Sequence, residues 1–227
     1  MARTELPNKK DKGLQQQTPD AVPKIPGFSV KIFGAVKFIL GILLLPFVYS
    51  AGNAFLIQFG LIDKSLQVCL WWGALTFILI YLFVWEPAVI YGWGHRVMEA
   101  TFSFFRPFVR FAPFLLPIYA IVILLFYAIS SNFVRDPWLL QYALFLSGFA
   151  ITMHLVFSSK TIRASKGDFL KGNYIFGFSL IFIINVGILS LGLSFIVRDF
   201  SFVVFSSEAY TLAREIYYAV FKQLFIR

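Results

Sequence analysis

The sequence is poor in charge. Charged side chains make up 14% of its 227 residues, whereas a soluble globular domain carries about 25%. A chain with so few charges cannot coat a globule with them, which excludes an ordinary soluble domain. The hydrophobic residues, 59% of the total, arrive in long uninterrupted runs. This pattern predicts an all-α integral membrane protein with several transmembrane helices.

The residues that would carry familiar chemistry are also missing. Cys69 is the only cysteine, so the chain cannot form an internal disulfide. Neither the HExxH pattern of zinc proteases nor a glycine-rich phosphate loop occurs. The aspartates all fall outside the predicted spans, which excludes an intramembrane aspartyl pair: Asp11, Asp20, Asp63, Asp136, Asp168 and Asp199.

A serine nucleophile inside the membrane would need a histidine within reach. Ser147 and His154 share a predicted helix, but they are seven residues apart. That separation is roughly 10 Å by helical rise, too long for a direct hydrogen bond. We therefore expect no enzymatic activity, no cofactor and no bound metal.

Five apolar blocks are long enough to cross a hydrocarbon core, which takes about 20 residues. Pro46 and Asn53 interrupt the first block only mildly, and Pro113 and Pro117 lie near the start of the third, where proline is tolerated. The sequence therefore predicts five transmembrane helices, over residues 28–62 (continuous from 38), 65–85, 112–134, 138–158 and 174–197.

The basic residues give an orientation. With five spans, fourteen of the 20 lysines and arginines fall on the side of the N-terminal tail. By the positive-inside rule this predicts a cytoplasmic N-terminus and a C-terminus on the opposite side, in a membrane that we take to be the bacterial inner membrane. The net charge of +9 sits in the tail and the connections, so we expect contact with lipid headgroups and not with nucleic acid.

The chain divides into a polar tail (1–27), a five-helix domain (28–200) and a C-terminal segment (201–227). Within 207–227, polar residues recur every three or four positions opposite an apolar face, which predicts an amphipathic helix: Glu208, Thr211, Glu215, Tyr218 and Lys222. Such a helix lies on the membrane surface or docks onto another polypeptide. Both interpretations stay open from the sequence.

The stretch from 84 to 111 mixes aromatic rings with arginines. It predicts an elbow at the membrane surface, with rings at headgroup depth and cationic side chains on phosphates. Gly92 and Gly94 would permit a tight bend there, and Glu99 would share a face with Arg96. The candidate headgroup contacts are Trp93, Arg96, Arg106, Arg110, Lys160 and Arg163.

A sharper interpretation makes Glu86, His95 and Glu99 a proton-handling site, with His154 on the same side of the membrane. A histidine that bonds to a carbonyl or a tyrosine is the simpler alternative. Polar residues inside predicted spans are candidates for function by default, and they are Asn53, Gln141, His154 and Asn185. We interpret the asparagines as helix–helix hydrogen bonds, and the pairs Ala143/Ser147 and Ser190/Ser194 as close helix contacts.

These observations favour a non-catalytic membrane subunit that anchors or assembles a larger complex. The expected partners are lipids and other membrane-protein subunits, which would bind through residues 1–27 and 207–227. The alternative is a component of a lipid or small-solute transport system, because ring-rich helices with little charge suit an apolar cargo.

Overall fold

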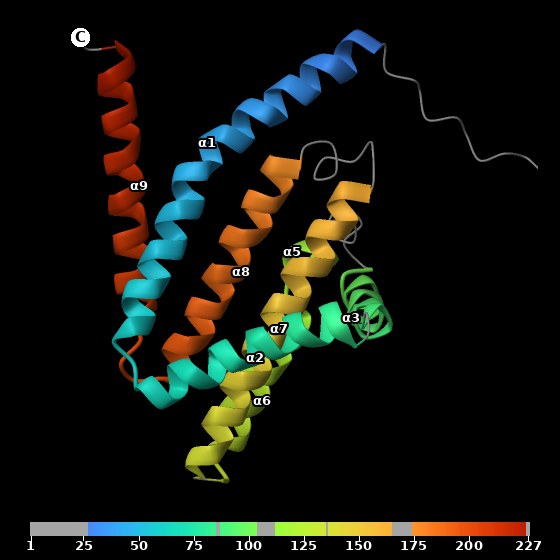
Figure 1. Cartoon of the computed structure of the whole chain (residues 1–227), viewed down its shortest axis with the longest axis vertical. Coiled ribbons are helices and arrows are strands. Elements are labelled where there is room, and N and C mark those ends of the chain that lie inside the picture. Colours follow the sequence, from blue (N-terminus) through green and yellow to red (C-terminus); the bar gives the residue numbers. More distant parts are fainter. Residues whose placement is uncertain (1–26, 85–86, 104–111, 135, 165–173, 226–227) are drawn as a thin grey trace, which may run out of the picture.

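The computed structural model describes residues 27–84, 87–103, 112–134, 136–164 and 174–225. All the regular structure in these ranges is helical (Figure 1). The helices are α1 (Gly27–Gly60), α2 (Lys64–Phe83), α3 (Ala88–Thr101), α5 (Ala112–Leu115), α6 (Ile118–Ser130), α7 (Pro137–Ala164), α8 (Tyr174–Ile196) and α9 (Phe202–Phe225).

Four of these helices are long and apolar enough to cross a membrane. They contain the stretches Gly34–Gly60 in α1, Lys64–Phe83 in α2, Trp138–Ile162 in α7 and Tyr174–Ile196 in α8. The described part of the chain is thus all-helical and has the helices of a membrane protein, as the composition predicted. Four of the five predicted spans correspond to these helices.

Two of the candidate spans begin at short turns whose aspartates cap the helix. The Asp63 carboxylate accepts a hydrogen bond from the Ser65 N–H at 2.7 Å, and the Asp136 carboxylate accepts one from the Trp138 N–H at 3.0 Å. Aspartate is a preferred residue at a helix N-cap because its oxygen satisfies an N–H that has no partner in the helix. The charged residues of these turns therefore fix where α2 and α7 begin.

The predicted third span differs from the other four. Residues 112–134 form two helices, α5 and α6, and α6 has only 13 residues, about 20 Å of helix. Pro117 has no N–H and disfavours the helical conformation of the residue before it. It therefore ends α5, although its place near the helix start had suggested that it would be tolerated. A fifth span stays a prediction.

Helices α2 and α7 touch through their backbones. A Cβ atom on Gly73 of α2 would lie 2.8 Å from the carbonyl carbon of Phe145, and one on Gly148 of α7 would lie 3.0 Å from that of Leu70. The two glycines thus occupy reciprocal positions that only glycine fits. Ala143 and Ser147, where we expected close packing of α7, are also buried, and the backbones approach most closely beside them at Gly148.

Helix α9 begins at Phe202, five residues before the predicted segment, and runs antiparallel along the side of α1 (Figure 1). Gln58 donates a hydrogen bond to Glu208 at 3.5 Å near one end of the contact. Near the other end, the Tyr217 hydroxyl donates to the Leu43 carbonyl, and the Tyr217 ring lies 5.6 Å from that of Phe47. The helix therefore packs beside a candidate span, and its last residues point toward the end of the molecule where α1 begins.

Candidate functional site

The break between α5 and α6 leaves two backbone carbonyls without their helical partners. In an unbroken helix the carbonyls of Phe114 and Leu115 would accept from the N–H groups of residues 118 and 119. The Ile118 N–H instead donates to the Leu116 carbonyl at 3.0 Å. Both carbonyls at the end of α5 are therefore available to donors from other helices.

Two buried side chains of neighbouring helices form hydrogen bonds with these carbonyls. His154 Nε2 of α7 lies 3.1 Å from the Phe114 carbonyl oxygen, and Asn185 Nδ2 of α8 lies 3.1 Å from that of Leu115. His154 is 5% exposed and Asn185 is fully buried. Within a membrane a free backbone carbonyl is costly, so a helix can break only where neighbours supply such donors.

The network continues from His154 toward α3. The Ser158 hydroxyl lies 3.3 Å from His154 Nε2 and 3.1 Å from the Tyr91 hydroxyl. We call these side chains and the two carbonyls the break cluster; it consists of Tyr91, Phe114, Leu115, His154, Ser158 and Asn185. It joins α3, α5, α7 and α8, and a separate bond from the Tyr119 hydroxyl to the Ile90 carbonyl joins α6 to α3.

The hydrogen bonds of the break cluster limit its chemistry. Because a carbonyl can only accept, His154 Nε2 must carry the proton that it donates to Phe114. The same nitrogen faces Ser158, so it cannot act as the base that would activate this serine. Burial raises the pKa of the Tyr91 phenol above its usual 10.0, opposed to a smaller extent by the hydrogen bond to Ser158. Tyr91 is thus a neutral hydroxyl at physiological pH.

Two of the three predicted proton-handling residues, His95 and Glu99, lie next to each other. The ring of His95 lies 5.1 Å from that of Phe114, and the rings of His95 and His154 lie 6.3 and 6.0 Å from that of Tyr91. Both histidines are thus at one end of the bundle, as expected. His95 Nδ1 lies 3.3 Å from the Glu99 carboxylate, so the partner of Glu99 is His95 and not the predicted Arg96. Glu86 lies outside the described residues.

His154 follows the simpler of the two interpretations, since it bonds to a backbone carbonyl. Asn185 makes an interhelical hydrogen bond, as predicted. Asn53 on α1 and Gln141 on α7 are half-buried, and neither belongs to the break cluster. Ser158 was missed, although it follows His154 by four residues and therefore shares its helix face.

The predicted elbow is in part a regular helix. Gly92 and Gly94 lie inside α3 and make no bend. A Cβ atom on Gly94 would lie 2.6 Å from the ring of Tyr119, so this glycine serves close packing of α3 on α6. Trp93 and Arg96 are exposed on α3, and Lys160 is exposed near the end of α7. The remaining candidate headgroup contacts, Arg106, Arg110 and the side chain of Arg163, lie outside the described part of the chain.

Among the described residues, no three His, Cys, Asp or Glu side chains lie close enough together to hold a metal ion. Comparisons with protein-family models, with curated proteins and with solved structures find no match to this chain. The chemistry of the break cluster and the surface of the bundle are therefore the grounds on which a function can be argued.

Tyr91→Phe is expected to destabilise the fold by about 1 kcal/mol, because it removes one hydrogen bond from the break cluster and leaves its ring packing in place. Tyr81→Phe is the matched control, since Tyr81 packs on the same Phe157 ring, at 6.0 Å compared with 5.1 Å for Tyr91. Thermal unfolding in detergent measures both. Equal midpoints for the two variants would show that the Tyr91–Ser158 bond contributes nothing.

Proposed function

We propose that this chain is a non-catalytic multipass membrane subunit that anchors or assembles a larger complex, and that α9 is its assembly surface. One observation carries the proposal: α9 holds a charged face away from the bundle, along the side of a candidate span. The residues of this face are all exposed, and we call it the outer face of α9: Ser207, Thr211, Arg214, Glu215, Tyr218 and Lys222.

The two faces of α9 are opposite one another. Phe205 and Ala213 are buried, and at 100° per residue they lie on the side of the helix that Ala209 also shares. Thr211 and Tyr218 lie roughly half a turn away from them. A hollow of about 300 Å³ on this far side is lined by Thr211, Arg214, Glu215 and Tyr218.

The position of the outer face makes lipid a poor neighbour for it. The α1 residues beside α9, from Leu43 to Gln58, lie in a stretch that is long and apolar enough to cross a membrane. An arginine facing hydrocarbon at the middle of a bilayer costs about 2.5 to 3.5 kcal/mol. A protein surface that pairs with these charges removes that cost, which favours a partner chain over lipid.

In the proposed arrangement the five predicted spans cross a bacterial inner membrane, with α5 and α6 together as a broken third span and the N-terminus in the cytoplasm. The basic residues of the tail and the loops support this orientation. Helix α9 then runs back beside α1 toward the cytoplasmic side. The tail itself, residues 1–27, lies outside the described residues, and its role as a second contact for partners is part of the proposal. Because α9 runs antiparallel to α1, this arrangement returns the C-terminus to the side of the N-terminus, whereas the basic residues predicted the opposite side.

The native mass of the complex in mild detergent tests the proposal. The mass is expected to exceed that of one chain, and replacing Thr211, Arg214, Glu215 and Tyr218 by alanine is expected to lower it. Alanine keeps the helix, and the face against α1 is unchanged. Tyr142→Ala with Leu146→Ala, both exposed on α7, is the control that should leave the mass as it was. A single-chain mass for the native sequence would refute assembly.

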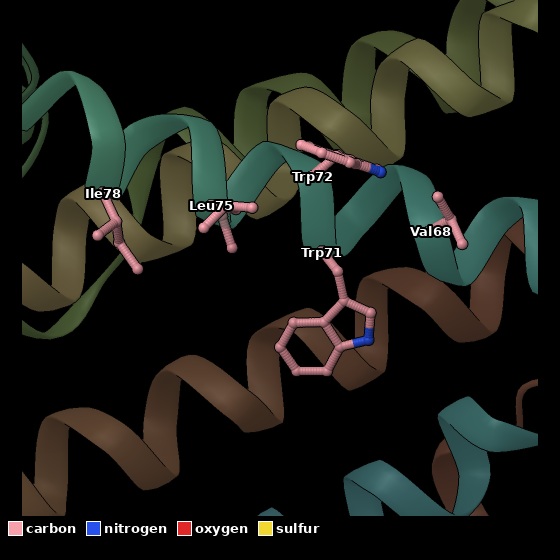
Figure 2. A pocket seen from close by; sticks show the side chains of 6 residues that line it. Val68, Trp71, Trp72, Leu75 and Ile78 are labelled. Carbon is pink, nitrogen blue, oxygen red and sulfur yellow. The ribbon is translucent and has the colours of Figure 1, made fainter.

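A second candidate, a component that carries an apolar molecule, is favoured by the space between the helices. A cavity of about 280 Å³ lies between α1, α2, α7 and α8, with Phe55, Leu70, Ile151 and Val186 among its walls. A neighbouring groove of about 390 Å³ runs along α2, where Figure 2 shows Trp71 pointing toward α8. Mass spectrometry of lipid retained by the purified chain tests this candidate, and Val186→Trp should reduce the retained lipid.

A further inference from the structure

We infer that the partner on the outer face of α9 is a second copy of this chain, with the two α9 helices side by side and parallel. This inference rests on the proposed function, in which α9 is the assembly surface. It adds the identity of the partner and the symmetry of the contact.

The charges of the outer face are complementary to themselves. Arg214 and Glu215 are adjacent in sequence, so their side chains leave the helix about 100° apart. Thr211 and Tyr218 lie between them in direction, and Arg214 and Glu215 therefore flank the middle of the face on opposite edges. A two-fold axis places the Arg214 edge of one copy against the Glu215 edge of the other. Arg214 of each chain then meets Glu215 of the other at nearly the same height, which forms two ion pairs.

The membrane determines the direction of the pairing. Copies of one chain that insert in the same orientation can be related only by an axis along the membrane normal. Because α9 runs along α1 beside a candidate span, that axis makes the two α9 helices parallel. An antiparallel pair would require copies of opposite orientation, and the strong bias of basic residues toward one side opposes a mixed orientation.

The middle of the face and its end supply the remaining contacts. Tyr218 is 66% exposed, and Thr211 precedes it by seven residues, the spacing at which residues of paired parallel helices return to the same seam. Phe221 and Phe225 are 55% and 71% exposed, with ring centroids 4.8 Å apart. In a parallel pair these rings lie at the rim of the seam and cover the second copy, so aromatic area is buried beside the ion pairs.

Charge reversal tests the pairing in the intact chain. Arg214→Glu places a like charge against each Glu215 across the axis, and it is expected to weaken dimerisation about tenfold or more. The double variant Arg214→Glu with Glu215→Arg exchanges the partners and is expected to restore the native dimer. Lys222→Glu is the matched control, because it makes the same change in net charge on the same face but has no acidic residue opposite it. Mass in mild detergent over a dilution series measures all four chains.

A cross-link tests the direction. In a Cys69→Ser background, Tyr218→Cys is expected to form a disulfide between two copies, because position 218 meets its own counterpart in the parallel pair. An antiparallel pair centred on Arg214 and Glu215 would place it opposite Thr211. Ala209→Cys, on the side toward α1, should form none. A cross-link absent at 218 overturns the parallel pairing.

The outcomes separate the inference from the proposed function. Two copies that dissociate with Arg214→Glu and re-form with the double variant support both. One copy bound to other chains, released by changes on the outer face, keeps the proposed function and overturns the second copy. A dimer that dissociates no more readily with Arg214→Glu than without it also overturns the inference. One copy alone overturns both.

Discussion

Gly73→Ala is expected to destabilise the folded chain by about 3 kcal/mol, at the upper end of the cost of overpacking a core. The added Cβ atom would lie 2.8 Å from the carbonyl carbon of Phe145 and 3.0 Å from the nitrogen of Phe149. These are backbone atoms, so no side chain can turn aside to make room. Helices α2 and α7 would have to separate along their whole contact. In thermal unfolding the midpoint should fall by about 6 to 12 °C.

Gly187→Ala provides the control within the same membrane domain. Gly187 lies inside α8, and a Cβ atom there meets nothing within 4 Å. Because alanine is the better helix former, this change should be neutral or slightly stabilising. Gly148→Ala should reproduce the loss of Gly73→Ala from the other side of the contact. If Gly73→Ala and Gly187→Ala unfold at the same temperature, the backbone contact between α2 and α7 is not part of the fold.

Asn185→Leu is expected to cost about 2 kcal/mol, because it leaves the part-buried Leu115 carbonyl without a donor. Leucine has the same branched skeleton as asparagine but larger terminal groups, so the loss of the hydrogen bond is separated from the change in packing by comparing two backgrounds. The cost should depend on the break in the helix. Pro117→Ala supplies an N–H at position 117 and allows α5 and α6 to join, and the carbonyl would then accept from within the helix. In that background Asn185→Leu should cost at least about 1 kcal/mol less.

A double-mutant cycle measures this dependence directly. The four chains are the native sequence, Asn185→Leu, Pro117→Ala and the double variant, each unfolded in the same detergent. Equal costs of Asn185→Leu in both backgrounds would show that the asparagine does not act on the broken helix. Replacing Ser194, whose hydroxyl donates to the Leu191 carbonyl within α8, should show no coupling to Pro117.

The spans were predictable because apolar length depends on local composition alone. The predicted blocks 65–85 and 174–197 end within two residues of α2 and α8. The block 138–158 stopped at the first polar residues, whereas α7 continues to Ala164. Ser159 and Thr161 return hydrogen bonds to carbonyls of their own helix, so they do not end it. Polarity marks where hydrocarbon ends, and the helix need not end there.

The break cluster was only half visible in the sequence. His154 and Asn185 could be recognised as polar residues within spans, but their partners are backbone carbonyls, which every residue has. The four-residue spacing of Pro113 and Pro117 was the available signal of freed carbonyls, and it was interpreted as a tolerated helix start. The packing of α9 on α1 depends on residues far apart in the chain, and no local pattern encodes it.

The contact between α9 and α1 also orders events during synthesis. The hydrogen bond from Tyr217 to Leu43 joins residues 174 positions apart, so the first span is made long before the helix that packs beside it. Until the last residues emerge, that side of α1 faces lipid or a chaperone. A chain that ends early would lack both this cover and the charged face that α9 carries. In the proposed assembly only completed chains would carry the contact face, so incomplete products would stay separate from it.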